Sequence, residues 1–292
     1  MKILVIGASG QVGKNLFMKL KEKGHIVYGT KNNSTEAGDL MGLDIKNSVA
    51  TKNIITKINP DCVVLAAAMT NVDYCEDHKE TAVETNVLGT NNVVKACREV
   101  SAKLVFLSTE YIFDGVSGPY KEDAKSNPVS VYGSTKLEGE KLVESLSNYL
   151  IVRTTWVFDY GVDDRNFAVR LMTELKKGNT FKVPNDQYST PTLASNLADV
   201  LIELLDKNKK GVYNIAGTTL LSKYDFAVKI ADKLGLNKNL IQGIDTKSLG
   251  QKAKRPMRAG LDTSKVRKEI SGNLLSLDEA LDVLKRKVET HE

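Results

Sequence analysis

The chain has 292 residues, of which 41% are hydrophobic and 26% charged, so it is long enough for one large α/β domain or two unequal lobes. Its formal net charge of +5 is mild, which argues against a nucleic-acid partner and suits an anionic small molecule. No apolar run approaches the roughly 20 residues of a membrane span, and the N-terminal run is too short for a signal peptide. The three cysteines form no CxxC pair and do not cluster with the histidines. We therefore expect no disulfide framework, no metal site, no membrane contact and a cytoplasmic protein.

The first half of the chain alternates strand and helix patterns. Near-continuous apolar runs predict strands that are covered on both faces, at Lys2–Ile6, His25–Gly29, Cys62–Leu65, Leu104–Ser108 and Leu150–Arg153. Helical periodicity fills the gaps between them, at Gln11–Lys23, Val49–Ile58, Val87–Val100 and Ser134–Ser145. This alternation predicts an α/β fold of the Rossmann type, a doubly wound parallel sheet that binds ligands at the carboxyl ends of its strands.

The alternation breaks down beyond Trp156. The patterns there predict one strand at Val212–Ile215 and helices at Asn166–Lys177, Leu193–Asp206, Ser222–Leu234 and Ser276–Lys287. No linker rich in Pro, Gly or Ser divides the halves, so we expect a smaller C-terminal substrate lobe interleaved with the first domain. The predicted domains are residues 1–155, with part of 181–212 returning to them, and residues 156–292 for the substrate lobe.

A glycine-rich segment follows the first predicted strand, Gly7-Ala8-Ser9-Gly10-Gln11-Val12-Gly13. Gly7 permits a tight turn, Gly10 lets the backbone approach a phosphate, and Gly13 allows a helix to pack closely on the sheet. A strand, a glycine turn and a helix N-terminus together are typical of a site for a dinucleotide pyrophosphate. The competing interpretation is a structural turn without a ligand.

The end of the second strand bears on the choice of cofactor. An acid there would bind the adenosine ribose of NAD, whereas basic residues accommodate the 2′-phosphate of NADP. The chain reads Tyr28-Gly29-Thr30-Lys31-Asn32-Asn33, with one lysine and no acid. This favours NADP as the cofactor of the domain formed by residues 1–155, with NADPH preferred and NADH still possible. The alternative is that Lys31 is a solvated loop residue.

A phenol and an ammonium lie four residues apart in Tyr132-Gly133-Ser134-Thr135-Lys136, which places them on one face of a helix. Reduction of a ketone creates an alkoxide that must be protonated as hydride arrives. The ordinary pKa of tyrosine is about 10, and an adjacent ammonium lowers it by favouring the phenolate. Lys136 can also hold the nicotinamide ribose. A hydroxyl at the end of the preceding strand, Thr109 or Ser108, would hold the carbonyl oxygen.

The chain resembles the extended short-chain dehydrogenase/reductases and, among these, the dTDP-4-dehydrorhamnose reductase family. The matching segments run through most of the sequence: Gly7–Gly13, Ala66–Asp73, Asn86, Ser108–Gly115, Pro119–Glu122, Tyr132–Lys136, Gly139-Glu140, Arg153–Trp156, Asn166-Phe167, Asp186–Thr192, Arg255-Pro256 and Leu261–Lys265. Each segment alone is weak, but their order and spacing together are specific.

The resemblance implies a role for individual residues. Cofactor contacts would come from Gly10, Gln11 and Val12 at the pyrophosphate, Asp44 and Ile45 at the adenine, and Ala66, Ala67 and Ala68 behind the nicotinamide. Tyr132, Lys136 and Thr109 would be catalytic, and Thr70, Thr109, Glu110 and Trp156 would touch the sugar. The family commonly has aspartate at the position of Glu110, which leaves the identity of the sugar open. For Trp156, packing in the core is the alternative to contact with the sugar.

The implied function is NADPH-dependent reduction of the 4-keto group of a nucleotide-linked deoxysugar, with a homodimer as a further expectation. Two other interpretations stay open. The segment from Ser108 to Gly115 also resembles the NADP-binding regulatory β subunit of methionine adenosyltransferase, and a sugar-nucleotide epimerase or dehydratase would share the fold. Within the basic stretch before Leu261, Arg255 is predicted to hold the substrate diphosphate, because a guanidinium binds phosphate oxygens with a planar fork of donors.

Overall fold

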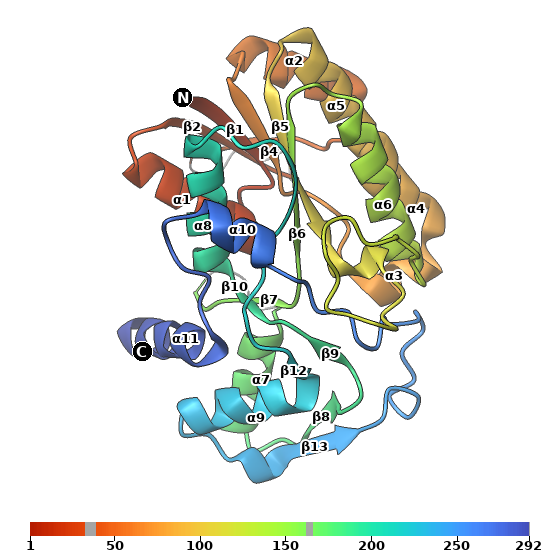
Figure 1. Ribbon diagram of the computed structural model, residues 1–292, viewed down its shortest axis with the longest axis vertical. Coiled ribbons are helices and arrows are strands. Elements are labelled where there is room, and N and C mark those ends of the chain that lie inside the picture. The colour runs from red at the N-terminus through yellow and green to blue at the C-terminus, as the bar shows by residue number, and fades with distance from the viewer. Residues whose placement is uncertain (33–38, 162–165, 292) are drawn as a thin grey trace.

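The computed structural model describes residues 1–32, 39–161 and 166–291. Its centre is a sheet of seven parallel strands in the order β3-β2-β1-β4-β5-β6-β11 (Figure 1). The strands are β1 (Lys2–Ile6), β2 (Ile26–Lys31), β3 (Leu40–Gly42), β4 (Cys62–Leu65), β5 (Lys103–Thr109), β6 (Tyr149–Thr154) and β11 (Gly211–Asn214). The order reverses between β1 and β4, which creates the crevice where such sheets bind ligands.

Helices cover both faces of this sheet, and together they form the large lobe. On one face lie α1 (Gln11–Glu22) and α8 (Ala194–Asp206), and on the other lie α2 (Ser48–Ile58), α5 (Thr90–Glu99) and α6 (Val131–Glu144) (Figure 1). Successive residues of β1 enter opposite cores: Ile3 and Val5 pack in one, Leu4 and Ile6 in the other. Because both faces of the central strands β1, β4 and β5 are buried, these strands are largely apolar, and the predicted Rossmann-type fold class is confirmed.

The small lobe lies at the carboxyl end of the sheet, in the lower part of Figure 1. It contains α7 (Phe167–Lys176), α9 (Lys223–Lys233) and α11 (Leu277–His291), which share an apolar core with Phe158. Short strands form three pairs: β7 (Val157–Phe158) with β10 (Thr192–Leu193), β9 (Tyr188–Ser189) with β12 (Leu221–Ser222), and β8 (Phe181–Pro184) with β13 (Ile241–Ile244).

The chain crosses between the lobes more than once. After entering the small lobe it returns through α8 and β11, and β11 pairs with β6 in parallel at the edge of the large sheet. Residues 194–214 therefore complete the large lobe although they follow much of the small lobe in sequence. The exact domain boundaries stay a prediction.

Several short elements were not predicted from the sequence. They are α3 (Val72–Asp77), α4 (Lys79–Val83), the π-helix η1 (Glu84–Gly89), the 3₁₀-helices η2 (Glu110–Ile112) and η3 (Lys238–Leu240), and α10 (Ser264–Glu269). The predicted helix from Val87 is an α-helix only from Thr90, because η1 precedes it. The helix predicted from Ser134 begins earlier, at Val131, since the Ser130 side chain accepts a hydrogen bond from the Gly133 backbone N–H.

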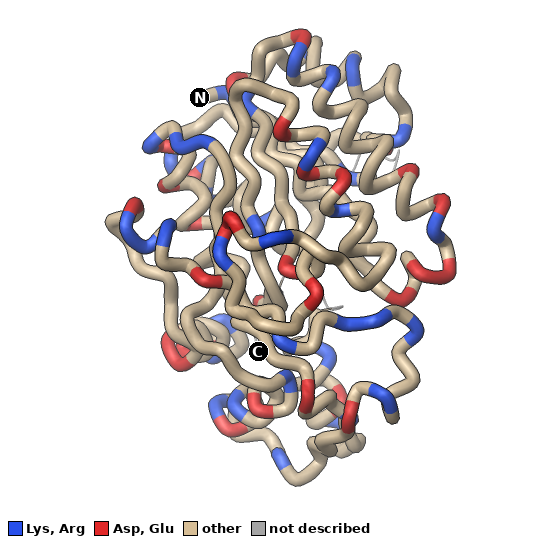
Figure 2. The backbone as a smooth tube through the Cα atoms, turned by 45° about the vertical axis from the view of Figure 1, so that its right-hand side comes forward, with Lys and Arg blue, Asp and Glu red and all other residues tan. Residues whose placement is uncertain are grey.

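Charged residues of both signs are interspersed along both lobes (Figure 2). In the described ranges, no helix combines the length and the apolar character that crossing a bilayer requires. Among the same residues, no three His, Cys, Asp or Glu side chains converge as they would around a metal ion. Cys62, Cys75 and Cys97 are buried free thiols.

Candidate active site

A cleft of about 730 Å³ opens at the carboxyl ends of β1, β4, β5 and β6. The structure brings all the predicted site residues except Arg255 to its walls: Gly7, Gly10, Gln11, Val12, Gly13, Lys31, Asp44, Ile45, Ala66, Ala67, Ala68, Thr70, Thr109, Glu110, Tyr132, Lys136 and Trp156. Segments that are separated by more than a hundred residues in the sequence thus meet at one edge of the sheet.

The glycine turn lies at one end of the cleft. Gly7 has a positive φ of 89°, and a Cβ there would approach the Ala67 backbone N to 2.7 Å. A Cβ on Gly13 would lie 2.1 Å from the Gly7 carbonyl oxygen, so Gly13 lets α1 pack on the turn itself. A Cβ on Gly10 would meet only the Gly7 oxygen, at 3.5 Å. Since α1 begins with no side-chain cap and no acid in its first turn, its N-terminal N–H groups fit a pyrophosphate.

Two lysines line the cleft beside the ends of β2 and β3. One is Lys31, as predicted, and the other is Lys46, which the sequence analysis missed. Asp44 shares this wall, and its carboxylate lies 3.7 Å from the Lys46 ammonium. Asn33, part of the segment that suggested NADP, lies outside the described residues. Two cations at this end suit the additional phosphate of NADP better than the diol of NAD.

The pair Tyr132 and Lys136 lies on the face of α6 that lines the middle of the cleft. Tyr132 packs edge-on against Tyr111, with ring centroids 5.4 Å apart, and it lies beside the Thr109 hydroxyl. The Lys136 ammonium is 3.8 Å from the centroid of the Phe106 ring. Ser108, the other predicted hydroxyl, also lines the cleft, and its buried Oγ has no hydrogen-bond partner in the described structure.

Burial controls the protonation of this pair. It raises the pKa of Tyr132 to about 12, although the Thr109 hydroxyl acts in the opposite direction. Burial also lowers the pKa of Lys136 to about 7, partly offset by the Glu140 carboxylate. The predicted lowering of the tyrosine pKa by Lys136 is therefore not what this structure shows, because desolvation of the phenolate is the largest effect on this pKa and the Thr109 hydrogen bond opposes it only in part. At neutral pH Tyr132 holds its proton, as a proton donor must.

Two buried contacts that the sequence analysis missed fix α6 in place. The Asn86 amide, within the π-helix η1, donates to the Met69 carbonyl at 3.1 Å and to Thr135 Oγ1 at 3.1 Å. Arg153 on β6 donates to both carboxylate oxygens of Glu140, at 3.0 and 2.7 Å. Asn86 and Arg153 belong to the segments that carry the family resemblance, but sequence spacing alone does not show what they contact.

Glu110 closes the far end of the cleft. Ser189 of the small lobe donates a hydrogen bond to its carboxylate, and the Ser189 and Thr155 hydroxyls lie 2.5 Å apart. Burial raises the pKa of Glu110 to about 8, against the opposing effects of Ser189, Thr155 and the Lys223 charge. Trp156 follows on the same wall with a positive φ of 36°, an uncommon conformation that turns the chain into the small lobe.

Arg255 does not line the cleft. Its guanidinium donates to the Asp73 carboxylate at 2.9 Å and to the Ala253 carbonyl at 3.1 Å, and only 8% of its side chain is exposed. The ion pair joins the loop before α10 to the start of α3. The two neighbouring lysines differ from Arg255, since Lys252 pairs with Asp77 at 2.5 Å on the surface and Lys254 is exposed.

The sheet order, the glycine turn and the Tyr/Lys pair on the helix after β5 are the features expected from the resemblance to the extended short-chain dehydrogenase/reductases. The chain belongs to the family described as the RmlD substrate binding domain, which matches residues 1–289.

Named relatives agree with this assignment. The chain is 34% identical over 279 residues to the dTDP-4-dehydrorhamnose reductase of Aggregatibacter actinomycetemcomitans, covering 91% of this chain and 92% of that protein. A crystal structure of a dTDP-4-dehydrorhamnose reductase from Clostridium acetobutylicum is 33% identical, with a TM-score of 0.89, over 100% of this chain and 99% of that one. The Bacillus anthracis dTDP-4-dehydrorhamnose reductase, solved in complex with NADP, is 29% identical, with a TM-score of 0.89, over 97% and 98%.

Proposed function

We propose that the protein reduces the 4-keto group of a nucleotide-linked deoxysugar with NADPH, the substrate being dTDP-4-dehydrorhamnose or a close analogue. The observation that carries the proposal is the meeting of Tyr132, Lys136 and Thr109 with the glycine turn in one cleft. The reductase names of the relatives, and the NADP bound by the Bacillus anthracis protein, support it.

Bound NADPH supplies the hydride for this reaction. Tyr132 Oη gives its proton to the sugar oxygen as the alkoxide forms, because burial keeps the phenol protonated at neutral pH. The Thr109 hydroxyl donates to the same oxygen and orients it. Lys136 holds the nicotinamide ribose, and its charge is available below the pKa of about 7 that burial gives it. The Ala66–Ala68 segment provides an apolar wall behind the nicotinamide.

The direct test follows the loss of NADPH absorbance with a panel of 4-keto sugars carrying dTDP, UDP or GDP. Turnover with one of them, and its loss in Tyr132→Phe, would support the reductase. Tight NADPH binding by the wild type without turnover of any panel member would favour the regulatory-subunit interpretation instead. The homodimer, the cytoplasmic location and the absence of a nucleic-acid partner stay predictions.

A further inference from the structure

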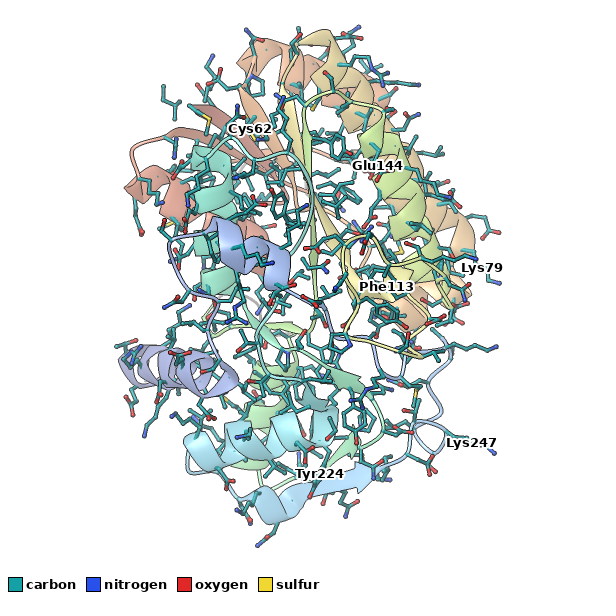
Figure 3. The ribbon with its side chains drawn as sticks, viewed as in Figure 1. Cys62, Lys79, Phe113, Glu144, Tyr224 and Lys247 are labelled. Atoms are coloured by element: carbon teal, nitrogen blue, oxygen red, sulfur yellow. The ribbon has the colours of Figure 1, made fainter. Side chains whose placement is uncertain are left out.

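A lysine that the proposed mechanism does not use lies next to the far end of the cleft. Lys223 is the first residue of α9, and its backbone N–H donates to the Gln187 carbonyl at 2.9 Å. The pairing of β12 with β9, which places Ser222 opposite Tyr188, fixes its position. Figure 3 labels the next residue, Tyr224, in the small lobe. Lys223 itself is not among the residues that line the cleft, but its ammonium contacts the ring of Trp156, which does line it.

Aromatic rings, not carboxylates, hold the Lys223 ammonium. Its Nζ lies 5.0 Å from the centroid of the Trp156 ring and 5.0 Å from that of Phe167. In the part of the chain that the structure describes, Lys223 forms no ion pair. Partial burial without a counter-charge is unfavourable for an ammonium, and cation–π contacts offset only part of that cost.

The surrounding charges leave this region positive. Desolvation, together with the Arg255 and Arg170 charges, lowers the pKa of Lys223 to about 8, while Glu110 acts in the opposite direction. The Glu110 carboxyl accepts its hydrogen bond from Ser189 and forms no ion pair with Lys223 among the described residues, while burial raises its own pKa to about 8. Arg255 is already paired with Asp73. Lys223 is thus a charged group whose hydrogen-bond donors stay available to an anion.

We propose that Lys223 binds the diphosphate of the nucleotide sugar, in place of the Arg255 contact that the sequence suggested. The inference rests on the proposed function for the identity of the substrate. Trp156, a predicted sugar contact on the wall of the cleft, lies 5.0 Å from the Lys223 ammonium, and the charge of Glu110, another predicted sugar contact, acts on the same ammonium. An ammonium next to the sugar contacts suits the phosphate that is attached to the sugar.

The test measures nucleotide binding independently of turnover. Because Trp156 is the single tryptophan of the chain, its fluorescence reports directly on this end of the cleft. The protein is first saturated with NADP⁺, which blocks nucleotide binding at the glycine turn, and is then titrated with dTDP or with thymidine. The variants are Lys223→Met, which keeps the apolar stem, and Lys223→Arg, which keeps the charge. Lys229→Met is the matched control, since Lys229 lies on the same helix and pairs with Asp278 on the surface.

We expect Lys223→Met to weaken dTDP binding by about tenfold or more, the effect of one lost charge-assisted hydrogen bond, with thymidine binding unchanged. Lys223→Arg should keep at least part of the affinity, and Lys229→Met all of it. Equal dTDP affinity in Lys223→Met and the wild type would overturn the inference, as would an equal loss for dTDP and thymidine, which would indicate a structural role. If no 4-keto sugar is reduced but dTDP binding still depends on Lys223, the proposed function fails and this inference stands.

Discussion

Two buried ionisable side chains in the cleft shift toward their neutral forms. The pKa of Lys136 falls to about 7 and that of Glu110 rises to about 8, and in both cases loss of hydration is the largest cause. Each group therefore lowers the stability of the fold in the pH range where it is charged. Such a loss of folding stability is expected at a site where catalysis or binding requires a titratable group to be buried away from water.

The proton-donor role of Tyr132 can be tested by removing its hydroxyl. We expect Tyr132→Phe to lower turnover by about 10²–10⁴-fold, the usual contribution of a positioned general acid, and to leave NADPH binding intact. Lys136→Ala should impair both cofactor affinity and rate, since this residue serves both. Steady-state kinetics and calorimetric titration with NADPH measure the two effects. Turnover of Tyr132→Phe within a factor of about three of the wild type would exclude the assignment.

Glu110 should give stability a distinct pH dependence. Its pKa is near 4.5 in the unfolded chain and about 8 in the folded one, so the folded state retains a proton across this window. Its contribution to the free energy of unfolding is therefore fully present below about pH 4.5 and declines as the pH rises through about 8. Glu110→Gln cannot ionise, and we expect it to reduce the loss of stability between about pH 5 and about pH 8 by about 3–4 kcal/mol.

Urea unfolding at both pH values measures this difference. Glu99→Gln, at an exposed position, serves as the control and should leave the pH dependence as in the wild type. The same pH dependence in Glu110→Gln and the wild type would show that Glu110 is already ionised in the fold.

Lys31 should determine the cofactor preference. Lys31→Asp places a carboxylate where the 2′-phosphate of NADPH would bind, so NADPH affinity should fall and the preference over NADH should be reversed or lost. Calorimetric titration of wild type and variant with both cofactors measures it. Equal affinity of the wild type for NADPH and NADH would contradict the assignment.

At the scale of single elements, the large sheet was predictable because its strands are buried on both faces. Short continuous apolar runs such as Leu104–Phe106, in a chain of ordinary composition, indicate strands that are buried on both faces of a parallel sheet. The paired strands of the small lobe were not predictable, since strands of two residues, such as β7 and β12, show no periodicity. Contacts such as Asn86 with Thr135, or Lys223 with Trp156, join distant segments and depend on the tertiary fold.

The glycine turn offers a matched pair of substitutions. Gly13→Ala would place a Cβ 2.1 Å from the Gly7 oxygen, so α1 must move away from the turn. We expect a loss of about 1–3 kcal/mol of stability together with weaker NADPH binding. Gly10→Ala has room within the protein, with its nearest contact at 3.5 Å, and should weaken NADPH binding while leaving Tm nearly unchanged. Thermal unfolding and NADPH titration separate the two; identical behaviour of both variants would refute the roles given to these glycines.

At the scale of the whole molecule, several polar contacts hold the lobes together across the cleft. Ser189 with Glu110, Arg255 with Asp73, and Asn15 of α1 with Asp159 at 3.2 Å each join segments far apart in sequence. The small lobe contributes Trp156 and Val157 to the walls of the cleft, and the other lining residues come from the large lobe. Its shape therefore depends on how the two lobes are held.

The Arg255–Asp73 ion pair tests this dependence. Arg255→Ala should raise the Michaelis constant for the sugar nucleotide with little change for NADPH, because the loop before α10 loses its attachment to α3. Asp73→Ala should reproduce the change, since it breaks the same contact. Steady-state kinetics with each substrate varied in turn measures both variants. An effect of Arg255→Ala that Asp73→Ala does not share would instead indicate direct contact between Arg255 and substrate.

Because β11 follows the other strands of the sheet late in the sequence, the large sheet can be completed only late in the synthesis of the chain. Strand β6 ends at Thr154, but its neighbour β11 begins only at Gly211, and α8, which covers one sheet face, lies between them. At about 5–20 residues per second, a ribosome needs about 3–11 s to add the intervening residues. Throughout that interval the nascent chain presents an unpaired strand edge and an uncovered apolar face to the cell. The emerging polypeptide should then be a substrate for ribosome-associated chaperones, and release from them should follow the emergence of Asn214 from the exit tunnel.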